Sequence, residues 1–122
     1  MSVEKTREFY RDFSDLCDCA YCRNYIREIK KVYPDLESFL DKIGVDIEKP
    51  FETMPGEPCG GYIEYLGVQY IIIGNKDEFR KTKLGEVTID IAELFPDPGI
   101  DGDYFVIEIY PIKLKCTIEG EV

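Results

Sequence analysis

The chain has 122 residues, of which 44% are hydrophobic and 33% are charged. A chain of this length fits one domain and buries roughly two-thirds of the surface that its unfolded form exposes, so disorder is excluded for most of it. The 25 acidic and 15 basic residues give a net charge of −10, which disfavours nucleic acid and anionic membranes as partners and favours a basic protein.

The sequence favours a cytoplasmic protein with reduced or metal-bound cysteines. No segment combines a basic start, an apolar middle and a small-residue cleavage site, the pattern of a secretory signal. The longest strongly apolar run, 70–73, is far too short to span a bilayer. The five cysteines are an odd number, which argues against a disulfide framework.

Residues 1–44 read as a layer of three helices. Phe9, Phe13 and Leu16 recur at helical spacing and predict a first helix over 3–16. A second helix is expected from about Asp18, a good N-capping residue, to Tyr33. Pro34 can open a third helix, over 35–43.

The remainder predicts a sheet. Residues 45–61, with three prolines and three glycines, read as a connector, and 62–118 as strands and loops. Gly67 is expected to turn a hairpin between the first two strands, and loops are expected over 75–85 and 94–103. The predicted strands are 62–66, 68–73, 87–91, 104–110 and 112–118. The expected fold is α+β in one domain, 1–122, with about three N-terminal helices on one face of a four- to five-stranded, mostly antiparallel sheet.

The cysteines Cys17, Cys19 and Cys22 form the most unusual feature of the sequence. Thiolates are soft ligands that suit zinc and iron–sulfur clusters, and a helix start stabilises them. A structural zinc site needs four ligands, and the chain has no histidine. The fourth ligand is therefore expected to be Cys59, followed by a glycine pair, with Cys116 or Asp18 as alternatives.

Two other interpretations of these cysteines stay open. The spacings from Cys17 to Cys19 and from Cys19 to Cys22 also suit a thiol redox protein or sensor that uses this cluster. Alternatively, Cys22 is a small hydrophobic core residue and its neighbours are incidental. Cys116 alternates in register with Ile112 and Leu114, which favours a core position.

Other candidates are weaker. Arg23 and Asn24 follow the cluster and could line a site, although a solvated helix face explains them equally well. The loop with Asp97, Asp101 and Asp103 does not have the spacing of a calcium site. Arg80, Lys81 and Lys83 form too short a basic stretch for nucleic acid.

The outward face of the sheet is a further candidate. Tyr62, Tyr104 and Tyr110 alternate with core positions and could form an interaction surface, unless another part of the chain covers them. Without histidine the common nucleophile systems are absent, so no catalytic residue is assigned. The leading hypothesis is a small acidic, non-enzymatic binding or accessory protein with a Cys-ligated metal. It would bind a basic protein or self-associate through the sheet; the alternative is the redox protein.

Overall fold

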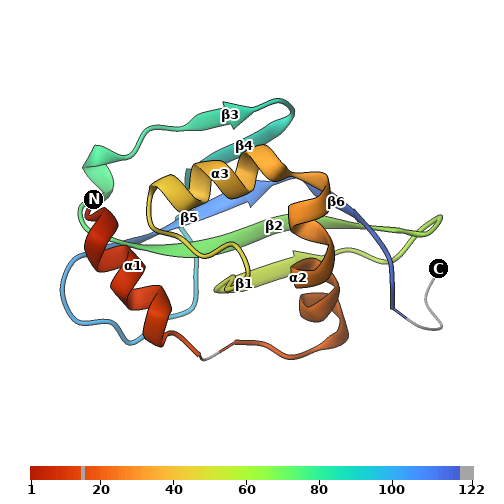
Figure 1. The fold of residues 1–122 in the computed structure, drawn as a ribbon, viewed down its shortest axis with the longest axis horizontal. Coiled ribbons are helices and arrows are strands. Elements are labelled where there is room, and N and C mark those ends of the chain that lie inside the picture. Colours follow the sequence, from red (N-terminus) through yellow and green to blue (C-terminus); the bar gives the residue numbers. More distant parts are fainter. Residues whose placement is uncertain (15, 119–122) are drawn as a thin grey trace.

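The computed structural model describes residues 1–14 and 16–118 and has an α+β fold, as the sequence predicts (Figure 1). Three helices come first, and a six-stranded antiparallel sheet follows. The helices are α1 (Val3–Asp12), α2 (Ala20–Val32) and α3 (Pro34–Lys42). The strands are β1 (Glu52–Pro55), β2 (Tyr62–Ile73), β3 (Thr82–Leu84), β4 (Val87–Ile91), β5 (Tyr104–Tyr110) and β6 (Ile112–Lys115).

The helix ends differ from the prediction at the positions that cap them. Helix α1 stops at Asp12 and does not reach Leu16. Helix α2 begins at Ala20, and its N-cap is Cys19 and not Asp18. The Cys22 N–H donates a hydrogen bond to Cys19 Sγ at 3.4 Å, so a thiol takes the place that an Asp or Ser oxygen usually holds. Pro34 opens α3 as expected.

The predicted hairpin at Gly67 is wrong, because 62–73 is one continuous strand. The first part of β2 pairs with β6 and its second part pairs with β5, so Gly67 lies inside the strand. The sheet order is β1-β2-β5-β4-β3, with β6 beside β2. Strands β1 and β3 were not predicted, and they raise the strand number from four or five to six.

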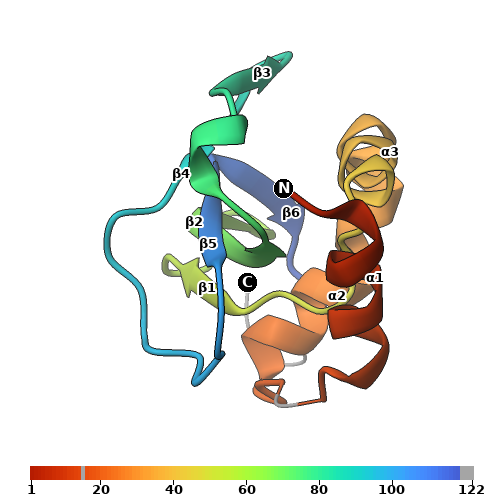
Figure 2. The same ribbon diagram turned by 90° about the vertical axis from the view of Figure 1, so that its left-hand side faces the viewer.

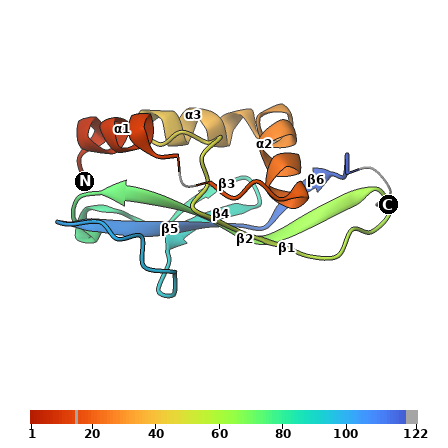
Figure 3. The same cartoon turned by 90° about the horizontal axis from the view of Figure 1, so that it is seen from below.

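The helices cover one face of the sheet (Figure 3). Tyr25, Ile29, Leu36 and Leu40 are buried there against β2 and its neighbours. Two buried hydroxyls, those of Tyr25 and Tyr70, lie 2.6 Å apart. The Tyr70 hydroxyl lies 2.7 Å from the Ile47 carbonyl oxygen and donates to it. Burial of these hydroxyls is therefore offset by hydrogen bonds, as a stable core requires.

Helix α1 completes the edge of β2 beyond the end of β1. The Tyr10 hydroxyl accepts from Ile71 N–H at 2.8 Å and donates to the Ile71 carbonyl at 2.7 Å. One helical turn earlier, Thr6 Oγ1 accepts from Ile73 N–H at 3.1 Å. Side chains four residues apart share one helix face. Thr6 and Tyr10 thus supply the hydrogen bonds that another strand would supply.

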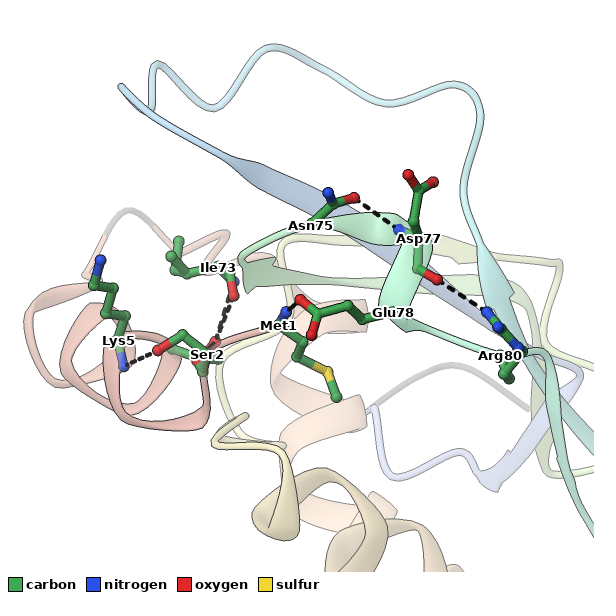
Figure 4. Close-up of polar contacts among 9 residues, drawn as sticks. Met1, Ser2, Lys5, Ile73, Asn75, Asp77, Glu78 and Arg80 are labelled. Atoms are coloured by element: carbon green, nitrogen blue, oxygen red, sulfur yellow. Dashed lines mark hydrogen bonds and ion pairs between the residues drawn. The ribbon is translucent and has the colours of Figure 1, made fainter.

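The start of α1 packs against the end of β2 (Figure 4). The Ser2 N–H donates to the Ile73 carbonyl at 2.9 Å, while the Ser2 hydroxyl accepts from Lys5 N–H. The Met1 nitrogen forms an ion pair with Glu78, which belongs to the short 3₁₀ turn after β2. Gly74 has φ +129°, and a Cβ there would lie 2.5 Å from Met1 Cα. Only glycine permits this close approach.

The opposite face of the sheet is covered over only part of its area. The segment between β4 and β5 crosses it, on the side away from the helices (Figures 2 and 3). Beneath this segment lie Ile71, Ala92 and Val106, and Tyr104 packs edge-on against Phe95. Tyr62, by contrast, is 49% exposed. The segment 93–103 therefore covers one of the tyrosines considered as an interaction surface and leaves another exposed.

Candidate metal centre

The three clustered cysteines lie together at the start of α2. The sulfur atoms of Cys17, Cys19 and Cys22 are all within 4.8 Å of one another. Cys17 and Cys19 are exposed, whereas Cys22 is buried on the first turn of the helix. A helix positions residues i and i+3 on one side, so the N-cap and first-turn sulfurs face each other, and Cys17 reaches them from the preceding coil. The arrangement could hold a metal ion.

Cys19 is the best stabilised thiolate of the three. Desolvation by itself would raise its pKa, but hydrogen bonds outweigh it and lower the pKa below the ordinary value. The donors are the Cys22 and Tyr21 N–H groups and the thiols of Cys17 and Cys22. Because unpaired N–H groups at a helix start favour negative charge, this is the place where a thiol ionises most readily.

Cys22 has the opposite electrostatic environment. Burial, together with the neighbouring sulfurs of Cys17 and Cys19, raises the pKa of its thiol to about 12, while a contact with Thr53 opposes the shift. The Cys22 Sγ lies 3.4 Å from Thr53 Oγ1 on β1. The pair Cys19 and Cys22 therefore combines an exposed thiol whose pKa is lowered with a buried thiol whose pKa is raised.

A small cavity of about 130 Å³ adjoins the sulfurs. All three cysteines line it, together with Ile26, Phe51 and Glu52 among others. Ile26 and Phe51 make part of its wall apolar, and Thr53, which contacts Cys22, lines it as well. Thr53 was missed in the sequence because it lies in 45–61, which reads as a connector; a short strand there, β1, carries its hydroxyl to 3.4 Å from Cys22 Sγ.

The other proposed ligands lie elsewhere. Cys59 is exposed and forms an isolated bridge with Tyr62, outside the group of three sulfurs. Its role as fourth ligand stays a prediction. Cys116 packs against the core that the helices cover, in agreement with its alternation. The Asp18 carboxylate lies 3.5 Å from Arg23 in an exposed ion pair.

Asn24, the residue considered as part of a site, joins α2 to the end of the sheet. It is fully buried. Its Nδ2 donates to the Lys115 carbonyl at 3.0 Å, and its Oδ1 accepts from Thr117 N–H at 2.7 Å. Since its amide is occupied by these contacts, Asn24 fixes the position of α2 and with it the direction of the cysteines.

The acidic loop does not assemble a site. Asp97 accepts a hydrogen bond from Gly99 N–H at 2.9 Å, as in an ordinary Asx turn. Among residues 1–14 and 16–118, the structure brings three or more metal-ligand side chains together in one place, the cysteine cluster. The same part of the chain contains no helix that is both long and apolar enough to cross a bilayer.

No protein-family model, curated protein or solved structure matches this chain. An argument about its function therefore depends on the chemistry of its own residues.

Proposed function

We propose that this protein is a small accessory protein whose Cys17, Cys19 and Cys22 bind a soft metal ion, with zinc as the occupant. The observation that carries the proposal is the convergence of three sulfurs within 4.8 Å. In a tetrahedral zinc site with bonds of about 2.3 Å, sulfur atoms lie about 3.8 Å apart. Small side-chain rotations are enough to reach that spacing.

The metal would strengthen the helical layer. Cys17 belongs to the coil that follows α1, and Cys22 belongs to α2 and contacts β1 through Thr53. A single ion bound to both would connect the coil, the helix and the sheet. The fourth position would be filled by water.

Metal content tests this proposal. The protein is purified without added metal or chelator, and zinc is measured by elemental analysis. We expect about one equivalent per chain in the wild type and in Cys59→Ser, and less than a tenth of that in Cys17→Ser, which loses one of three thiolates. A wild-type chain that stays empty, even after incubation with equimolar zinc, contradicts the proposal.

The face of the sheet away from the helices, which segment 93–103 covers in part, supports a basic protein as partner. A row of paired residues crosses four strands on this face: Glu52 opposite Gln69, Gln69 opposite Glu108, and Glu108 opposite Asp90. Like charges directly opposite each other are unfavourable in a sheet. Leu66 and Leu94 are 63% and 87% exposed, and the Leu94 carbonyl contacts Gln69 in this row. Exposed apolar side chains next to carboxylates suit a partner that presents an arginine among apolar residues.

The hydrogen bonds of the Gln69 side chain also favour a partner that presents an arginine. Its Nε2 donates to the Leu94 carbonyl at 2.9 Å and to Glu108 Oε1 at 3.0 Å, and the reverse orientation of the amide would set oxygen against two acceptors. Its buried Oε1 consequently has no hydrogen-bond donor within the described residues. An arginine that displaces the covering side chains could donate to Oε1 and to Glu108 together, because a guanidinium has five N–H donors.

The probe for this surface is acetyl-arginine methylamide, with the uncharged citrulline analogue as control. We expect backbone amide shifts at Gln69, Glu108 and Leu94 with the arginine compound alone, and their loss in Glu108→Gln. Equal shifts with both compounds, or shifts spread over the whole acidic surface, contradict the proposal. A concentration-dependent dimer that Leu66→Glu dissociates would replace it with self-association through the sheet.

A further inference from the structure

Two sulfurs of the proposed metal site differ in their exposure to solvent. Cys19 is exposed to solvent, whereas Cys22, three residues later, is buried with 5% of its surface accessible. Their sulfurs lie within 4.8 Å, and both belong to the same side of the first helical turn. A side-chain rotation of modest size brings two such sulfurs to the bonding distance of a disulfide.

We propose that Cys19 and Cys22, when no metal is bound, form a dithiol that reduces small exogenous disulfides. Cys19 is the attacking residue, because its sulfur meets solvent and accepts the Cys22 N–H at 3.4 Å. Cys22 is the resolving residue, because its burial keeps it away from a bulky disulfide but leaves it next to Cys19. The proposal goes beyond metal binding and uses two of the same three sulfurs.

The reaction takes place in two exchange steps. The Cys19 thiolate attacks one sulfur of the substrate RSSR, so that a Cys19–SR bond forms, the S–S bond of the substrate breaks and RS⁻ leaves. Cys22 then loses its proton to solvent and attacks Cys19 Sγ. The Cys19–Cys22 bond forms, the Cys19–SR bond breaks and a second RS⁻ leaves. Two protein thiols are oxidised, and one disulfide is reduced to two thiols.

Cys17 distinguishes this activity from metal binding. It lies in the coil before α2, two residues from Cys19, and not on the helical turn that joins Cys19 to Cys22. Metal binding uses all three sulfurs, whereas the exchange needs only the helical pair. Replacing Cys17 should therefore remove the metal and still allow the Cys19–Cys22 disulfide to form.

Oxidised glutathione is the probe, added to the full chain after removal of metal with a chelator. After quenching with an alkylating reagent, peptide mapping by mass spectrometry locates every disulfide.

In the wild type we expect a Cys19–Cys22 disulfide and two glutathione thiols per chain. In Cys22→Ser or Cys22→Ala, glutathione should remain attached to Cys19. Cys19→Ser should react at least about tenfold more slowly, whereas Cys17→Ser should still form the Cys19–Cys22 disulfide and release two glutathione thiols per chain. Circular dichroism spectra confirm that each variant is folded.

The outcomes separate the two proposals. A disulfide between Cys17 and Cys19, or a glutathione adduct that forms on Cys59 as fast as on Cys19, overturns the assignment of the dithiol. A chain that binds zinc but shows no exchange after metal removal refutes the dithiol alone. A chain that exchanges glutathione but never binds zinc refutes the metal site alone.

Discussion

Helix α1 and the start of helix α2 both carry side chains capable of bonding outside the helix, but they use them differently. In α1, the hydroxyls of Thr6 and Tyr10 are buried and bonded to the backbone of β2. At the start of α2, the thiols of Cys17 and Cys19 are exposed, and the Cys19 sulfur bonds to the helix end and to its neighbours. The first set maintains the fold. The second set remains accessible to a ligand, and this is why we place the function there.

The comparison predicts that the two regions can be disabled separately, and the largest effect belongs to the sulfurs. Cys19→Ala removes the most readily ionised thiolate of the cluster, and we expect zinc affinity to fall by at least about 100-fold. The free energy of unfolding of the metal-free protein should stay within about 1 kcal/mol of the wild type, because Cys19 is exposed and makes a weak cap. Competition with a chromophoric chelator measures the affinity, and urea unfolding measures the stability. An unchanged affinity contradicts the assignment of Cys19 as a ligand.

Tyr10→Phe tests the other region. The substitution leaves the buried N–H and carbonyl of Ile71 without their hydroxyl partner, so we expect a loss of about 1–3 kcal/mol in the free energy of unfolding. A loss of this size lowers the melting temperature by several degrees in a domain of this length. Zinc affinity of the folded variant should match the wild type. A variant as stable as the wild type would show that α1 does not complete the edge of β2.

Acid should weaken metal binding. The Cys22 pKa is raised to about 12, so this thiol is protonated at neutral pH and must lose its proton when metal binds. Each unit of pH gained between 6 and 8 should therefore raise the apparent zinc affinity by at least about tenfold. Because the pKa of Cys19 is lowered, this thiol should contribute no more to the slope than Cys22 does. Chelator competition at three pH values measures the slope, and a flat profile contradicts binding through Cys22.

The smallest effect is expected at Cys59. This residue is exposed in the turn before β2 and lies outside the group of three sulfurs. Cys59→Ser should change zinc affinity by less than about twofold, since an exposed side chain outside the site has little influence on it. A loss as large as that in Cys19→Ala would show that Cys59 reaches the metal, and would restore the four-cysteine site that the sequence predicted.

Part of this structure follows from local patterns and part does not. The helical stripes and the strand over 87–91 could be predicted because their apolar residues repeat at the period of the element. Gly67 misled the prediction, since a glycine inside a long strand looks like a turn until the pairing of β2 with both β5 and β6 is known. Strand β1 lies among prolines and glycines and has no period of its own.

The candidate site shows the same limits. The cysteine spacing revealed Cys17, Cys19 and Cys22, because one coil and one helical turn join them. The position of Thr53 beside them depends on β1 pairing with β2, a contact that no local pattern reports. Cys59 had a suitable neighbourhood of glycines, but its distance from the cluster is set by the path of the whole chain.

X-ray absorption at the zinc edge tests the central claim most directly, because it counts the atoms bound to the metal. For the wild-type chain loaded with one equivalent of zinc, we predict three sulfur atoms at about 2.3 Å and one oxygen at about 2.0–2.2 Å. Cys17→Ser should retain at most two sulfurs. A first shell of oxygen or nitrogen alone in the wild type would contradict metal binding by these cysteines.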